Sequence, residues 1–85
     1  MPYIIKDRRE KLDKFIDGLQ SELQCDGEVN YTITKIIQKY YFDGVGSYKI
    51  LNSAIGVLEC VKQEFYRRII VSYEERKIKE NGDVY

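Results

Sequence analysis

Apolar residues recur at helical spacing along most of this chain. In residues 7–24 they fall at positions i, i+3, i+4, i+7 and i+11, which form one face of an amphipathic helix: Leu12, Phe15, Ile16, Leu19 and Leu23. Asp7 and Glu10 have the spacing of a capping box at a helix start, with Asp in place of Ser or Thr. Gly27 is a suitable stop. The pattern predicts a first helix over residues 7–24.

A second apolar face follows in residues 28–42, where it is formed by Val29, Ile33, Ile36, Ile37 and Tyr40. The stretch from Tyr31 to Thr34 also has β propensity, so a strand competes for this segment. Apolar and polar residues do not alternate strictly, which favours a helix. The sequence Asp43-Gly44-Val45-Gly46 then breaks the chain.

The remaining pattern, residues 47–81, contains no proline and predicts a long third helix. A straight helix of this length would extend about 50 Å, whereas a compact chain of this size is only about 30 Å across. The β-branched run Ile69-Ile70-Val71 and the capping-box pair Ser72 and Glu75 favour a bend or break near Ser72. A short C-terminal helix would then end near Asn81-Gly82. We therefore predict an all-α fold that forms one domain over residues 1–85. Three main helices form a bundle, the long third helix is bent or broken near Ser72, and a short C-terminal helix follows it.

Composition excludes several classes of function. The 85 residues include 14 basic and 14 acidic side chains, so the net charge is zero, unlike that of a dedicated nucleic-acid binder. The chain has no histidine, which rules out Ser–His–Asp and Cys–His nucleophiles and every histidine-containing metal site. The sequence therefore predicts no catalytic residue, no metal and no cofactor.

The N-terminal residues and the cysteines indicate a cytoplasmic protein. Charged residues begin at Lys6, and no apolar run has the length of a signal peptide. The longest mostly apolar stretch, residues 54–58, is far shorter than the roughly 20 residues of a membrane span. Cys25 and Cys60 have no metal-binding spacing, so we expect free thiols in a reducing compartment, although one disulfide is possible.

The third helix carries a second face of small residues beside its main apolar stripe. This face comprises Ser53, Gly56, Val57 and Cys60. Small side chains allow a second backbone to approach closely, and a helix that is apolar on two sides is buried on two sides. The face either packs against the other helices of the same chain or meets a second copy in a homodimer, and the small size of the domain favours the dimer.

Glu59 is the one charged residue within the apolar block of the third helix. Asn52, Glu59 and Tyr66 follow at seven-residue steps along one edge, with Tyr48 beside them. Three interpretations stay open for this edge. Glu59 acts as a general base, the four residues form a buried polar network that fixes helix register, or the edge faces water.

The final third of the chain carries the most basic surface. Its candidate partner-binding residues are Arg67, Arg68, Arg76, Lys77 and Tyr85. Arginine beside tyrosine can pair with phosphates and stack on bases, which makes a nucleic-acid-binding accessory protein an alternative. Interleaved glutamates favour an ordinary solvated helix face instead. The acidic side chains of the first helix also suggest a small metal-dependent nucleotide hydrolase, but they point away from its apolar stripe.

Three stretches resemble a family of short uncharacterised proteins from bacteria, archaea and their phages. They are residues 27–34, residues 55–62 and the segment from Glu64 to the closing Glu-Asn-Gly-Asp-Val-Tyr. In that family a proline precedes the tyrosine that is Tyr73 here, and Ser72 in its place leaves the predicted break dependent on capping. The resemblance implies a compact helical domain of prokaryotic or phage origin and supplies no catalytic residues. Taken together, these features predict a non-catalytic interaction or regulatory module that acts as a homodimer.

Overall fold

The computed structural model describes residues 3–42 and 44–85, and every regular element within these ranges is a helix. The chain divides into two units, Met1–Val45 and Gly46–Tyr85. The elements, in chain order, are α1 (Lys6–Glu22), α2 (Asp26–Tyr41), α3 (Tyr48–Phe65), the π-helical turn η1 (Tyr66–Ile70) and α4 (Val71–Asn81). The predicted all-α fold with a long third helix is confirmed. The packing of these helices as a bundle and as one domain stays a prediction.

The ends of α1 differ from the sequence prediction in detail. Asp7 lies inside the first turn, and no side chain caps the helix. A carboxylate at this place still stabilises the helix because it faces the positive end of the helix dipole. Gly27 does not stop α1, which ends at Glu22 where Leu23 adopts an extended conformation. Gly27 instead lies in the first turn of α2.

The connection between α1 and α2 is short and is held by one side chain. Cys25, the residue before α2, is extended. The Glu28 side chain reaches back from the first turn of α2, and its Oε1 atom accepts a hydrogen bond from the backbone N–H of Gln24 at 2.9 Å. This contact resembles the acidic half of a capping box, because it satisfies a backbone donor at a helix start. It marks the beginning of α2 two residues earlier than the sequence predicts.

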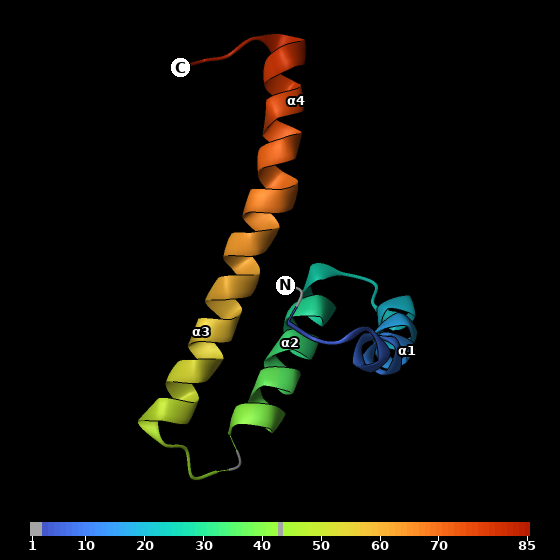
Figure 1. The fold of residues 1–85 in the computed structure, drawn as a ribbon, viewed down its shortest axis with the longest axis vertical. Helices are drawn as coiled ribbons and strands as arrows, with labels where there is room; N and C mark the ends of the chain where they lie inside the picture. Colours follow the sequence, from blue (N-terminus) through green and yellow to red (C-terminus); the bar gives the residue numbers. More distant parts are fainter. Residues whose placement is uncertain (1–2, 43) are drawn as a thin grey trace. The chain divides into compact units, whose positions relative to one another are not determined.

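Within the first unit, α1 and α2 run in different directions (Figure 1). Figure 1 shows α1 nearly end-on and α2 along its length. No Cα atom of α1 lies within 8 Å of a Cα atom of α2. The two backbones are thus well separated, and a groove lined by residues of both helices lies between them.

In the second unit, α3, η1 and α4 form one continuous helix from Tyr48 to Asn81 (Figure 1). Ser47 begins it as an N-cap, since its Oγ atom accepts a hydrogen bond from the backbone N–H of Ile50 at 3.3 Å. Gly82 ends it with a φ of 83°, a conformation that glycine adopts without strain. The predicted stop at Asn81-Gly82 is confirmed.

The irregularity expected near Ser72 lies slightly earlier and takes another form. The chain does not break, because Ile70 and Val71 keep helical dihedral angles. Instead, the five residues of η1 form a π-helical turn in which the N–H of Val71 donates to the carbonyl of Tyr66. Ser72 lies inside α4 and caps nothing; its hydroxyl donates to the carbonyl of Arg68 at 3.1 Å. A wider turn accommodates the branched side chains of residues 69–71 without interrupting the helix.

The helices carry apolar faces, but neither unit encloses them. Among the described residues, Ala54 is the one buried side chain, with 5% of its surface exposed. Phe15 in the middle of the α1 stripe is 79% exposed, and Phe65 at the end of α3 is 58% exposed. Each unit thus presents an apolar face that its own residues do not cover.

Candidate interaction surfaces

The small-residue face of α3 is open within its unit. Ser53, Gly56 and Cys60 are exposed, and Val57 is only partly covered. The Ser53 hydroxyl is occupied by the helix itself, because it donates to the carbonyl of Lys49 at 3.0 Å. A Cβ atom added at Gly56 would meet nothing within 4 Å. The face is therefore smooth, lacks unsatisfied hydroxyl donors and could be approached closely by another helix.

The apolar stripe of α3 lies on another side of the same helix. Apart from Ala54, its members are exposed to a third or more of their surface: Leu51, Leu58, Val61, Phe65 and Ile69. Large exposed apolar areas mark interaction surfaces in folded proteins. The long helix thus has two sides suited to packing, which agrees with the pattern read from the sequence.

Glu59 lies on the edge between these sides, with its side chain 53% exposed. Its Oε1 atom accepts a hydrogen bond from Nε2 of Gln63 at 2.8 Å and lies 3.7 Å from Nζ of Lys62. Among the described residues, no hydrogen bond joins Glu59 to Tyr48, Asn52 or Tyr66. The structure therefore places the four edge residues along one helix without linking them.

Tyr66 belongs to the π-helical turn and is directed along the chain toward α4. Its hydroxyl donates to Oε1 of Glu74 at 3.4 Å, eight residues further on. Tyr48 stands at the other end of the long helix and is exposed. These two tyrosines are thus separated by most of α3 and do not converge on a common site.

The basic residues of the second unit alternate with acidic partners. Nε of Arg68 lies 3.6 Å from Oε1 of Glu64, and Nζ of Lys77 lies 3.1 Å from Oε2 of Glu80. Arg67 stands on η1 next to this first pair. Pairing on an exposed helix contributes little to stability, but it reduces the positive field that a polyanion would meet.

Tyr73 in α4 carries two cations on its ring. Cζ of Arg76 and Nζ of Lys77 each lie 5.7 Å from the ring centroid. Such cation–π contacts hold long side chains close to the helix surface. Lys77 also pairs with Glu80, so its ammonium group is held by both a ring and a carboxylate.

The segment after α4 is the most exposed apolar part of the second unit. Val84 and Tyr85 are almost fully exposed. Oδ1 of Asp83 accepts a hydrogen bond from the backbone N–H of Tyr85 at 2.9 Å, which forms a local turn. Tyr85, predicted to bind a partner, is therefore accessible but distant in sequence from Arg67 and Arg68.

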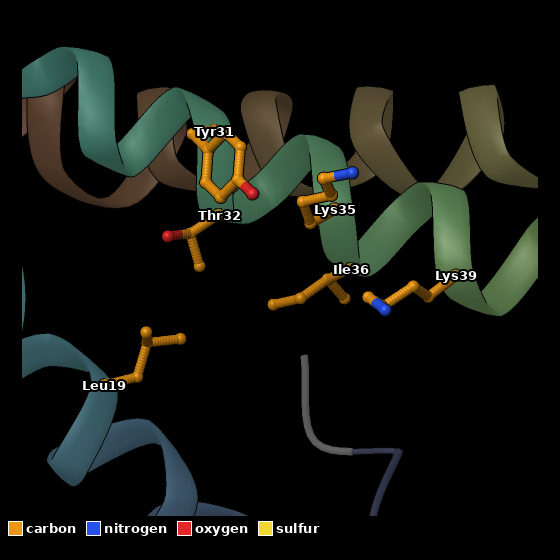
Figure 2. A pocket seen from close by; sticks show the side chains of 6 residues that line it. All are labelled: Leu19, Tyr31, Thr32, Lys35, Ile36 and Lys39. Carbon is orange, nitrogen blue, oxygen red and sulfur yellow. The ribbon is translucent and has the colours of Figure 1, made fainter.

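A groove in the first unit was not anticipated from the sequence. It lies between α1 and α2, has a volume of about 450 Å³ and is lined by Leu19, Tyr31, Thr32, Lys35, Ile36 and Lys39. Figure 2 shows Leu19 directed from α1 toward the space that Thr32 and Ile36 of α2 also face. One feature of the sequence points to the groove. Lys35 and Lys39 are spaced by one helical turn, and Ile36 lies between them in the sequence.

A comparison with protein families gives the chain a place among known sequences. Residues 1–84 match a family model described as a domain of unknown function, DUF6899. The chain belongs to the DUF6899 family. The comparisons with curated proteins and with solved structures found no match. The DUF6899 model covers both units, so family membership extends over α1 and α2 as well as over the long helix.

The described residues of this DUF6899 protein contain neither a group of metal ligands nor a helix that could span a membrane. Among residues 3–42 and 44–85, no three cysteine, aspartate or glutamate side chains are grouped closely enough to hold a metal ion. No helix in the same ranges is long and apolar enough to cross a membrane. Cys25 and Cys60 are free and exposed.

Proposed function

We propose that this DUF6899 protein is a non-catalytic interaction or regulatory module that acts as a homodimer. The observation that carries the proposal is the exposure of the apolar faces. Only Ala54 is buried among the described residues, and neither unit covers its own stripe. Burial of apolar surface is the main driving force of folding. A chain of this size buries a smaller share of its surface than a larger chain does, so each uncovered apolar face reduces its stability noticeably. A second copy provides the missing cover.

The face of α3 formed by Ser53, Gly56, Val57 and Cys60 is the surface that we propose for the dimer contact. Gly56 leaves open space for a facing backbone. In a two-fold dimer the same patch is used by both subunits, so a flat, self-complementary face suits it. The adjoining stripe of α3 would extend the contact with large apolar side chains.

Three further parts of the proposal rest on the sequence and on the free cysteines. The absence of histidine and of any catalytic motif supports a role without chemistry. The free thiols of Cys25 and Cys60 support a cytoplasmic location, because free thiols persist in a reducing compartment. The resemblance of the segment Glu-Asn-Gly-Asp-Val-Tyr to short prokaryotic and phage proteins supports an origin in that group.

Replacing Gly56 with glutamine tests the dimer contact. The change puts a long polar side chain at the centre of the proposed face, and we expect the dimer dissociation constant to rise at least tenfold. The isolated helix would gain about 0.5–1 kcal/mol, because glycine is a poor helix former. Sedimentation velocity reports the association, and far-ultraviolet circular dichroism reports the helix content.

Gly18→Gln is the matched control. Gly18 also lies inside a helix with nothing within 4 Å of an added Cβ atom, but it is in α1. We expect this variant to gain the same helix propensity and to keep the association of the unmodified chain. Equal dissociation constants for Gly56→Gln and the unmodified protein would contradict a dimer through this face.

Nucleic-acid binding is the second candidate, and the Tyr73 cluster is the observation that favours it. An exposed ring with Arg76 and Lys77 beside it could stack on a base while the cations pair with phosphates. Two observations weigh against nucleic-acid binding. The net charge is zero, and carboxylates pair with Arg68 and Lys77. A metal-dependent nucleotide hydrolase has less support still, since the described residues contain no grouped set of acidic ligands.

A further inference from the structure

The groove between α1 and α2 combines an apolar lining with positive charge. Leu19 and Ile36 line it, and none of the described residues that line it is acidic. Lys35 is half-buried beside them, with its Nζ atom 3.4 Å from Oε1 of Gln38 and 5.8 Å from the centroid of the Tyr31 ring. Lys39 follows one turn later along the same side of α2 (Figure 2).

The charge of these two lysines is not neutralised within the described part of the chain. No carboxylate there forms an ion pair with Lys35 or Lys39. A partly desolvated ammonium group is stabilised by a carboxylate, and apolar lining residues are stabilised by apolar cover. The groove therefore fits an occupant that carries a carboxylate next to apolar side chains.

The segment that follows α4 has this composition. Gly82 ends the helix with a positive φ, and residues 83–85 follow it without regular secondary structure. Asp83 is followed directly by Val84 and Tyr85, which are both almost fully exposed. The Asp83 carboxylate accepts a hydrogen bond from the N–H of Tyr85 and forms no ion pair within the described residues.

We propose that the groove between α1 and α2 binds residues 83–85 of a second copy of this chain. Asp83 of one subunit pairs with Lys35 and Lys39 of the other, while Val84 and Tyr85 cover Leu19 and Ile36. The argument is complementarity: a cationic apolar groove and an anionic apolar segment are both unpartnered on the same polypeptide. A two-fold dimer would use the contact twice. This inference rests on the proposed homodimer and adds a second contact to that of α3.

A charge-reversal cycle tests the contact. In the full chain, we expect Lys35→Glu with Lys39→Glu to raise the dimer dissociation constant at least tenfold, and Asp83→Lys to raise it by a similar factor. The triple variant restores opposite charges across the contact, and we expect its dissociation constant to return to within about threefold of the unmodified value. Rescue of this kind is specific, because a variant that fails to fold is not repaired by a third substitution.

Two controls separate this contact from a general effect of net charge and from a loss of helix. Lys6→Glu with Lys14→Glu changes the net charge equally on exposed positions of α1, and we expect unchanged association. Val84 lies outside every described helix. We therefore expect Val84→Asp to weaken the dimer and to leave the helix content unchanged.

Several outcomes would overturn the inference. One is a triple variant that associates no better than the double variant. Another is a triple variant that regains the stability of the unmodified chain but sediments as a monomer. This result would mean that residues 83–85 bind the groove of their own chain. If charge reversal has no effect while Gly56→Gln dissociates the dimer, the proposed function survives and the groove contact fails. If the unmodified chain is monomeric, the proposed function fails as well.

Discussion

Glu59 is held by the side chain one helical turn further along α3. The 2.8 Å hydrogen bond from Gln63 and the 3.7 Å approach of Lys62 both involve its Oε1 atom. About half of the Glu59 side chain is exposed, so water competes for the same oxygens. Contacts of this type on a helix surface contribute a few tenths of a kcal/mol. Glu59 is therefore a surface residue of its unit, whatever covers the neighbouring faces.

Replacing Glu59 with glutamine should change the free energy of unfolding by less than about 1 kcal/mol. The amide keeps an acceptor for Gln63 and loses only a screened charge. Urea denaturation at fixed protein concentration measures the change. Glu80→Gln, which removes the exposed 3.1 Å pair with Lys77, serves as a comparison of the same kind. A loss above about 2 kcal/mol for Glu59→Gln alone would instead indicate a buried polar network.

The sequence identified this edge correctly as one side of a helix but could not assign its contacts. Asn52, Glu59 and Tyr66 are spaced by seven residues, which is about 10.5 Å along a helix axis. Within the described part of the chain no hydrogen bond joins these three residues, whereas Gln63, one turn from Glu59, donates to its Oε1 atom. The seven-residue spacing therefore predicts a shared edge, and the four-residue spacing predicts the bond that forms.

At the scale of elements, two serines of the long helical segment behave differently. Ser47 caps α3 and satisfies the backbone N–H of Ile50. Ser72 lies within the long helix, and its hydroxyl bonds back to the carbonyl of Arg68. A hydroxyl that bonds four residues back within a helix contributes little or slightly destabilises it.

Alanine substitution separates these roles. We expect Ser47→Ala to destabilise the protein by about 1 kcal/mol, because a helix N-cap is lost. Ser72→Ala should be neutral or stabilise by a few tenths of a kcal/mol, because alanine is the better helix former. Chemical denaturation of both variants at one concentration gives the comparison. Equal losses for the two variants would mean that a helix begins at Ser72, as the capping-box pattern suggested.

Helix positions could be predicted from periodicity, whereas the π-helical turn could not. The apolar spacing placed three helices with ends within a few residues of those observed. The signal at Ser72 and Glu75 is ambiguous, since the same residues serve in a cap or on a helix surface. The branched run Ile69-Ile70-Val71 marked the region correctly. Its crowding is relieved by one wider turn, η1, and the chain continues as a helix.

At the scale of the molecule, the sequence shows where the apolar faces lie but does not show what covers them. The sequence predicted which residues form the stripes, because periodicity within a helix is a local property. What covers them depends on residues distant in sequence or on another chain, which periodicity does not encode. The groove between α1 and α2 was missed for the same reason, since Leu19 and Ile36 line it from two different helices.

Sedimentation equilibrium of the unmodified chain over a wide range of concentrations tests the central claim most directly. A homodimer predicts a particle of 20.2 kDa, twice the 10.1 kDa mass of one chain, that dissociates only on dilution. Its midpoint of thermal unfolding should rise with concentration over the same range. A mass of 10.1 kDa at every concentration, with an unfolding midpoint that does not depend on concentration, would contradict the account.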